Sequence, residues 1–88
     1  MTSRKKKKPK VIQNKDMAHK LLYDLSMYFE ECILFARPFE IKFYRLCQTQ
    51  LQLMRNTIDK NDEFYNQYFK NKTYREVMDW IEKESEKW

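Results

Sequence analysis

The stretch that decides the fold is Ile33-Leu-Phe-Ala-Arg-Pro-Phe39, which separates two long runs of periodic apolar residues. Pro38 cannot continue a preceding helix, because it lacks an amide proton and restricts the residue before it, but it suits the first turn of a new helix. The sequence therefore predicts one helix over 15–36 and a second over 38–60, each about 33 Å long. Their matched lengths and short connection favour an antiparallel helical hairpin, with one long kinked helix as the alternative.

Apolar residues recur at spacings of three and four in both runs, which is typical of helices that bury one face. On the first helix the expected core stripe is Ala18, Leu21, Leu25, Phe29 and Cys32. On the second helix it is Phe39, Phe43, Leu46, Leu51 and Met54. We expect the two stripes to pack against each other.

Two shorter helices are expected after the hairpin. Asn61-Asp62 marks the start of the first, which should end near Asn71. Thr73 and Glu76 have the spacing of a capping box, in which each side chain bonds the backbone amide of the other, so a last helix should cover 73–88. The predicted fold class is all-α, a small helical bundle.

The composition excludes several classes of site. The 88 residues contain no Gly, so the glycine-rich loops that bind phosphates cannot form. One His and two Cys are too few for a usual four-ligand zinc site. His19 is expected at the domain boundary or surface, and Cys32 and Cys47 as buried thiols on apolar faces. We therefore expect no cofactor, no metal and no enzymatic activity.

Charge is divided unevenly along the chain. Residues 1–15 hold seven Lys and Arg and no acid, whereas the remainder holds 11 basic and 13 acidic residues. The sequence predicts a disordered Lys-rich tail over 1–14 and a helical domain over 15–88. The basic cluster consists of Arg4, Lys5, Lys6, Lys7, Lys8 and Lys10. It resembles a monopartite nuclear-localisation signal; a phosphate-binding arm and a merely solubilising tail are the alternatives.

The segment 64–75 interleaves aromatic and basic residues. Aromatic rings can stack on unpaired bases while cations follow the nucleic-acid backbone. The candidates for such contacts are Tyr65, Tyr68, Lys70, Lys72 and Arg75. The same aromatic spacing also fits a core face or a protein interface, which is the stronger interpretation.

The predicted hairpin tip carries more apolar residues than one partner helix can cover. We expect Leu34, Phe35 and Ile41 to face something else, either the C-terminal helix, with Trp80 or Ile81 as a lid, or a second copy, or a partner protein. Fourteen aromatic residues and five Met in so small a chain also favour an interaction surface.

The function expected from these features is a non-enzymatic helical interaction module in the nucleus, an accessory subunit of a transcription, replication or ribonucleoprotein assembly. Small size and Lys/Asn/Tyr/Phe usage also fit a viral accessory protein. The alternative is a protein that binds DNA or RNA without sequence specificity through its tail and segment 64–75. We expect a protein partner or homo-oligomer and an intracellular location. No apolar run is long enough for a transmembrane segment, and binding to a membrane surface is disfavoured.

Overall fold

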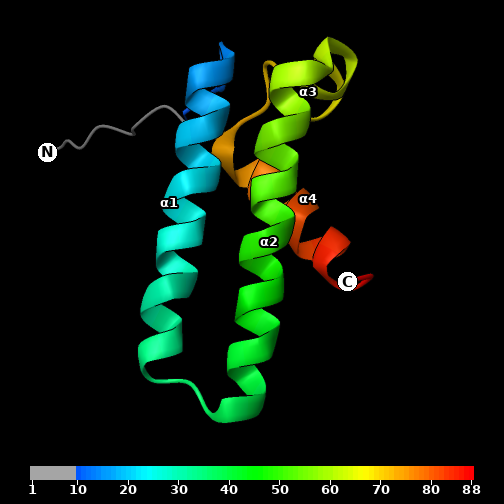
Figure 1. The fold of residues 1–88 in the computed structure, drawn as a ribbon. Coiled ribbons are helices and arrows are strands. Elements are labelled where there is room, and N and C mark those ends of the chain that lie inside the picture. Colours follow the sequence, from blue (N-terminus) through cyan, green and yellow to red (C-terminus); the bar gives the residue numbers. More distant parts are fainter. Residues whose placement is uncertain (1–9) are drawn as a thin grey trace, which may run out of the picture.

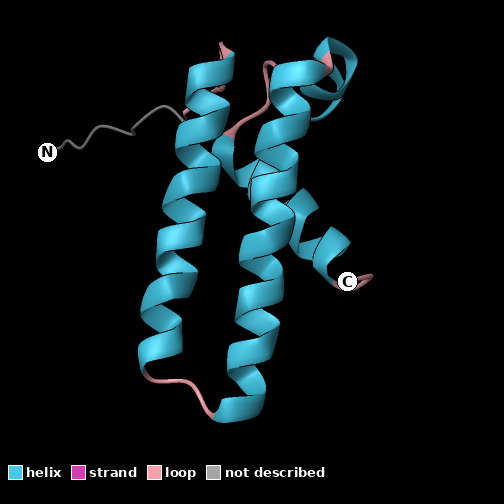
Figure 2. Cartoon of the chain, viewed as in Figure 1, coloured by secondary structure: helices cyan, strands magenta, loops and turns pink. Residues whose placement is uncertain are grey.

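A computed structural model describes residues 10–88, and Arg4–Lys8 lie outside this range. The described chain forms four helices, with loops between them and no strand longer than an isolated bridge (Figures 1 and 2). They are α1 (Lys15–Leu34), α2 (Pro38–Lys60), α3 (Asp62–Tyr68) and α4 (Tyr74–Ser85). The all-α fold, the antiparallel hairpin and the two shorter C-terminal helices are confirmed.

The helix boundaries follow from local hydrogen bonds. Asn14 starts α1 by accepting the amide of Met17 at 2.9 Å, and Asn61 starts α3 by accepting the amide of Phe64 at 3.1 Å. The predicted capping box of α4 is present: Thr73 Oγ1 accepts from the Glu76 amide, and Glu76 Oε1 accepts from the Thr73 amide. The helix α1 ends two residues before the predicted boundary.

The hairpin and α4 form two layers. The principal extents of the molecule are 45, 39 and 20 Å, so its thinnest dimension matches two helices of about 10 Å each. In Figure 1, α4 lies behind the hairpin and crosses its upper half. We call residues 15–26 and 47–60 the proximal half of the hairpin, and residues 27–46, which include the Pro38 turn, the distal half.

The core lies in the proximal half. Its buried apolar residues come from α1, α2, α3, α4 and the two connecting segments that flank them. They are Ile12, Ala18, Leu21, Leu22, Leu25, Leu51, Ile58, Tyr65, Phe69, Val77 and Ile81. The aromatic side chains of Phe64, Tyr68 and Trp80 close this end, because Trp80 stacks on Tyr68 with ring centroids 4.5 Å apart and meets Phe64 edge-on.

The expected domain boundary near Asn14 is corrected by the structure. Ile12 is fully buried, and its amide donates to the Lys72 carbonyl at 2.9 Å while its carbonyl accepts from the Asn71 amide at 2.8 Å. Val11 and Thr73 form an antiparallel bridge. Residues 10–14 therefore belong to the folded domain rather than to a disordered tail. The charge pattern concealed this, because two apolar residues inside a basic run give no periodic signal.

The expected core stripe of α2 is only partly correct. Leu51 is buried, but Phe39 is 68% exposed, Phe43 is 47% exposed and Leu46 is also exposed. Cys47 is buried, as expected for its thiol, and Ile58 is buried as well. The cause is the position of α4: Phe39 and Phe43 lie in the distal half, whereas the core that α4 closes lies in the proximal half.

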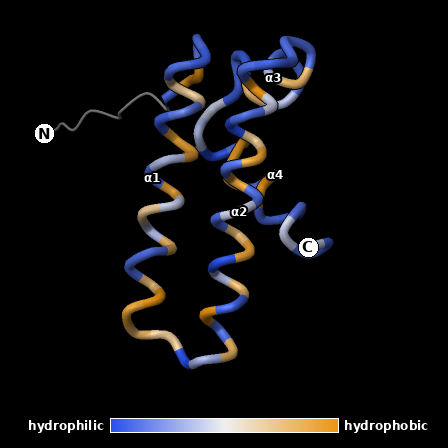
Figure 3. Tube along the Cα trace, in the orientation of Figure 1, coloured by the Kyte–Doolittle hydropathy of each residue, from blue (hydrophilic) through white to orange (hydrophobic). Residues whose placement is uncertain are grey.

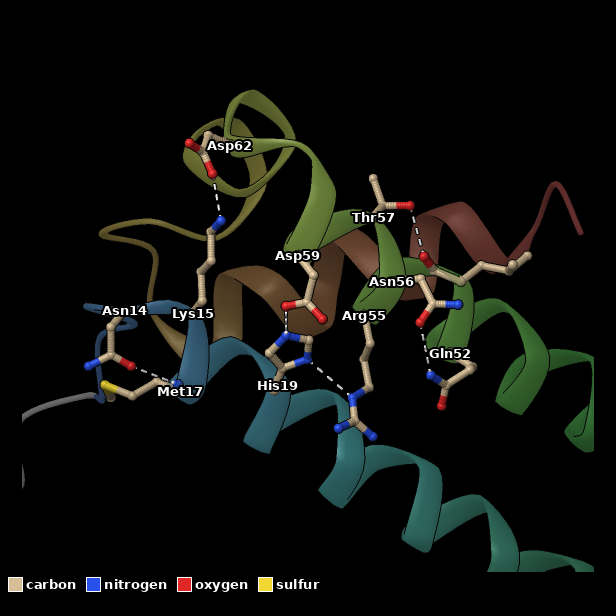
Figure 4. Close-up of polar contacts among 11 residues, drawn as sticks. Asn14, Lys15, Met17, His19, Gln52, Arg55, Asn56, Thr57, Asp59 and Asp62 are labelled. Atoms are coloured by element: carbon tan, nitrogen blue, oxygen red, sulfur yellow. Dashed lines mark hydrogen bonds and ion pairs between the residues drawn. The ribbon is translucent and has the colours of Figure 1, made fainter.

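Polar contacts join the two hairpin helices along the face opposite α4 (Figure 4). His19 Nε2 donates to Asp59 Oδ1 at 2.7 Å, and His19 Nδ1 accepts from Arg55 Nε at 3.2 Å, so the network requires the neutral tautomer protonated at Nε2. Lys15 bonds Asp62 and holds the pKa of that carboxyl below its ordinary value. His19 is thus a boundary residue that connects α1 to α2.

Candidate protein-interaction surface

The distal half of the hairpin keeps a large apolar surface exposed. Phe35 is 90% exposed and Leu34 is 74% exposed, on either side of the α1 C-terminus. Together with Phe39 they surround the turn at Pro38, and Figure 3 shows hydrophobic colouring along the lower end of α1. A monomeric soluble protein rarely leaves so many large apolar side chains together without a partner.

This surface continues into an apolar groove of about 420 Å³ between the hairpin and α4. We define the apolar groove by six lining residues: Leu25, Tyr28, Phe29, Phe43, Met78 and Trp88. A second hollow of about 430 Å³ lies on the other side of Met78, between α1 and α4. Both hollows are walled mainly by carbon atoms, so neither resembles a catalytic cleft with convergent polar groups.

Tyr28 joins the two hollows and is the most exposed aromatic residue of the groove. Its pKa is raised, first by a hydrogen bond with the Cys32 thiol, so the phenol is neutral at physiological pH. Phe29 stacks on Tyr44 with ring centroids 5.8 Å apart, which forms a floor between the two helices. The aromatic part of the groove is therefore suited to apolar side chains.

The predicted tip residues lie on different faces of their helices and differ in exposure. Tyr28 and Phe35 are seven residues apart, so Phe35, the C-cap of α1, follows the same face of the helix as Tyr28 of the apolar groove. Leu34 shares a different face with Met27, which is also exposed. Ile41 is only half-buried within the distal half. Helical spacing alone could have shown that Leu34 and Phe35 lie on different faces, whereas the location of the groove depends on the position of α4.

Of the three covers that the sequence left open for the tip, the structure does not support the C-terminal helix. Ile81 is buried in the proximal core, and Trp80 packs against Tyr68 at the same end. Neither residue reaches the turn at Pro38, so the two predicted lid residues close the opposite end of the hairpin. The tip is left uncovered by residues 10–88.

The segment 64–75 contributes differently from its expected stacking role. Tyr65 is buried, so its ring has no free face for a base; its hydroxyl finds no partner within residues 10–88, and burial raises its pKa. Trp80 covers one face of the Tyr68 ring. Lys70, Lys72 and Arg75 are exposed. Tyr65 must therefore be removed from the candidate stacking residues.

Backbone pairing places Lys10 beside this basic segment. The Tyr74 amide donates to the Lys10 carbonyl at 3.0 Å, and Lys10 Nζ lies 5.6 Å from the centre of the Tyr74 ring. We call Lys10, Lys70, Lys72 and Arg75 the basic surface. Its two parts are about 60 residues apart in the sequence, so their proximity follows from the fold and not from the sequence pattern.

The two cysteines of the described residues are free thiols. Cys47 is buried and burial raises the pKa of its thiol, which disfavours the nucleophilic thiolate. Cys32 is also a free thiol, half-buried on the same side of the hairpin. Within residues 10–88 no group of three His, Cys, Asp or Glu is placed to hold a metal ion. In that same range no helix is both long and apolar enough to cross a membrane.

Comparison with known proteins gives no relative on which to base a function. No protein-family model, no curated protein and no solved structure matches the chain significantly. The interpretation therefore depends on the geometry of the apolar groove and the basic surface.

Proposed function

We propose that this protein is a non-enzymatic helical interaction module that binds a protein partner through the distal half of its hairpin. The observation that carries the proposal is the exposure of Phe35 and Phe39 in the same half of the hairpin as Tyr28 and Phe43, which line the apolar groove. Burying two such side chains would contribute about 1.5–3 kcal/mol each, which is enough for them to act as interface anchors.

The test is affinity capture of the tagged chain, in which Phe35→Glu and Phe39→Glu are introduced together. Because both side chains are exposed, the double variant should keep its far-UV circular dichroism while losing its partner. Leu53→Glu is the matched control: Leu53 is also an exposed apolar residue of α2, but it lines neither hollow. A partner retained by the double variant would refute the proposal.

The place of action that we propose is the nucleus, where the chain would serve as an accessory subunit of a transcription, replication or ribonucleoprotein assembly. The support is the Lys-rich sequence over 4–10, which has the composition of an import signal. Replacing Lys5–Lys8 with Ala should move a large fluorescent fusion from the nucleus to the cytoplasm. A fusion that is cytoplasmic before the substitution would remove the nuclear assignment.

A second candidate function is binding of DNA or RNA without sequence specificity. The observation that favours it is the pairing of residues 10–12 with 71–74, which adds Lys70, Lys72 and Arg75 to the base of the Lys-rich run. The logarithm of the affinity should then fall linearly with the logarithm of the salt concentration, with a slope of about 0.9 for each phosphate neutralised on duplex DNA. Lys70→Ala with Lys72→Ala should lower that slope by about 2.

These two functions are separable by nuclease. Partners captured through nucleic acid are lost when the sample is digested, whereas partners captured through the groove are retained. A truncation that removes residues 1–13 is unsuitable for this test, because it deletes the buried Ile12 and would destabilise the domain. Substitution of Lys5–Lys8 avoids that difficulty.

A further inference from the structure

The charges around the apolar groove are of one sign. The charged side chains lining the groove are Asp79 and Glu82 of α4, and Asp24 is the one charged residue lining the neighbouring hollow. Glu31 lies three residues after Tyr28 and four before Phe35, so it borders the same face of α1. Asp79, Glu82 and Glu31 make no ion pair within residues 10–88, whereas Asp24 pairs with Lys20.

The shape of the free surface is that of a missing helix. The helices α1 and α2 are about 30 and 35 Å long, whereas α4 is about 18 Å long and covers the proximal half. The distal half therefore has room in the second layer for a helix of about ten residues beside α4, at the usual 8–10 Å from the hairpin helices. Val77 and Ile81 of α4 already show how an amphipathic helix packs onto this hairpin.

From these two observations we infer that the apolar groove binds an amphipathic helix of a partner protein, and that basic residues flank the apolar face of this helix. Its apolar side chains fill the space between Tyr28, Phe43 and Met78. Its Lys or Arg side chains meet the carboxylates of Glu31, Asp79 and Glu82. This inference rests on the proposed function and specifies the partner that the distal half accepts.

Two other occupants fit the surface less well. In a two-fold pair of this chain each rim meets a copy of the same set of residues, so carboxylates of one copy would face carboxylates of the other. The chain's own residues 1–9 are basic but include Met1 as their only large apolar side chain, so they cannot fill the groove.

The test uses two synthetic 14-residue helices with the same Leu face, at positions i, i+3, i+7 and i+10. In one peptide the flanking positions are Lys, and in the other they are Glu. Fluorescence anisotropy with the full 88-residue chain should show the Lys peptide binding about ten-fold tighter at low salt, because three rim carboxylates each contribute a weak attraction. The difference should shrink as the ionic strength rises.

Substitutions in the chain assign the binding to the groove. Glu31→Lys with Glu82→Lys should remove the preference for the Lys peptide, and Phe43→Ser should weaken both peptides. Leu53→Ser is the matched control and should bind as the unmodified chain does. Far-UV circular dichroism identifies any variant that fails to fold. If Phe43→Ser does not fold, the Glu31→Lys, Glu82→Lys variant tests binding at the groove independently.

Three outcomes overturn the inference. Equal affinity for the two peptides would refute the requirement for basic flanks. Binding that is unchanged by both Phe43→Ser and the charge reversal would show that the peptide binds outside the groove. Failure of both peptides to bind removes the helical partner; if the chain then sediments as a dimer that Phe35→Glu dissociates, a second copy is the occupant. The proposed function is judged separately, by whether the Phe35→Glu, Phe39→Glu variant loses its captured partner.

Discussion

The distal half of the hairpin is richer in apolar residues than the proximal half, yet fewer other segments pack against it. In the proximal half, Ile12, Phe69 and Val77 come from three separate segments and enclose the space between α1 and α2. In the distal half, α1 and α2 pair with each other and their second face stays open around Phe35 and Phe39. The comparison shows that apolar periodicity identifies a face that needs cover, whereas the length and position of a third element decide which part of that face is core.

The largest expected effect is in the proximal half. Phe69→Ala should lower the free energy of unfolding by about 3–5 kcal/mol, because Phe69 is fully buried and its ring meets those of Phe64 and Trp80 at 5.8 Å. Urea unfolding followed by circular dichroism measures the change. Phe35→Ala is the distal counterpart and should cost no more than about 0.5 kcal/mol. Similar losses at the two positions would abolish the distinction between the halves.

The segment before α1 should contribute nearly as much. Ile12→Ala should cost about 2–5 kcal/mol, because it leaves a cavity beneath the connection between α3 and α4. Gln13→Ala, at the exposed next position, serves as the control and should change stability by less than about 0.5 kcal/mol. Equal and small effects would mean that residues 10–14 do not form part of the proximal core.

Phe43 tests the border between the two halves. Since about half of the residue is exposed, Phe43→Ala should cost about 1.5–2.5 kcal/mol, roughly half the value for a fully buried ring. Addition of the Lys-flanked peptide should enlarge that loss, because the unmodified chain gains stability from a ligand that the variant binds weakly. A loss as large as that of Phe69→Ala would place Phe43 in the core after all.

The capping of α4 should have a smaller effect. Thr73→Ala removes the acceptor of the Glu76 amide and should cost about 1 kcal/mol. Because α4 covers the proximal half, hydrogen exchange should rise at α4 and at Phe69 before it rises at the tip. Thr73→Ser retains the hydroxyl and should restore most of the loss.

The smallest expected effect is the pH dependence of the distal half. The hydrogen bond from Gln48 and the charge of Arg45 lower the pKa of Glu30. A carboxyl whose pKa is lower when folded stabilises the protein above its ordinary pKa, and that contribution is lost as the pH falls through the folded value. In the Glu30→Gln variant the thermal midpoint should therefore fall slightly less steeply as the pH drops below about 4.5. Thermal unfolding at a series of pH values measures this dependence. An unchanged profile would show that Glu30 is not coupled to folding.

Much of the fold could be predicted from local signals. Pro38 fixed the start of α2, and the spacing of Thr73 and Glu76 fixed the start of α4, because both depend on neighbours within a few residues. The packing of Ile12 could not be predicted in this way. It depends on Asn71 adopting a left-handed backbone, with φ of 63°, in a chain that has no Gly to mark the turn.

The candidate site was only partly predictable for a similar reason. An exposed apolar tip followed from Phe35 and its neighbours, since one partner helix covers one side of α1 only. The acids that surround the groove lie on α1 and α4, and their common location depends on the angle at which α4 crosses the hairpin. Sequence spacing carries no information about that angle.

The bridge between Val11 and Thr73 has a consequence for the order of folding. The bridge joins residues about sixty positions apart in the sequence, so its formation depends on contacts that are distant along the chain. The hairpin, whose contacts are close in sequence, can form earlier and more rapidly. Residues 10–14 should therefore attach last and detach first, so the Ile12 amide should exchange its hydrogen through a partial opening that leaves α1 and α2 paired.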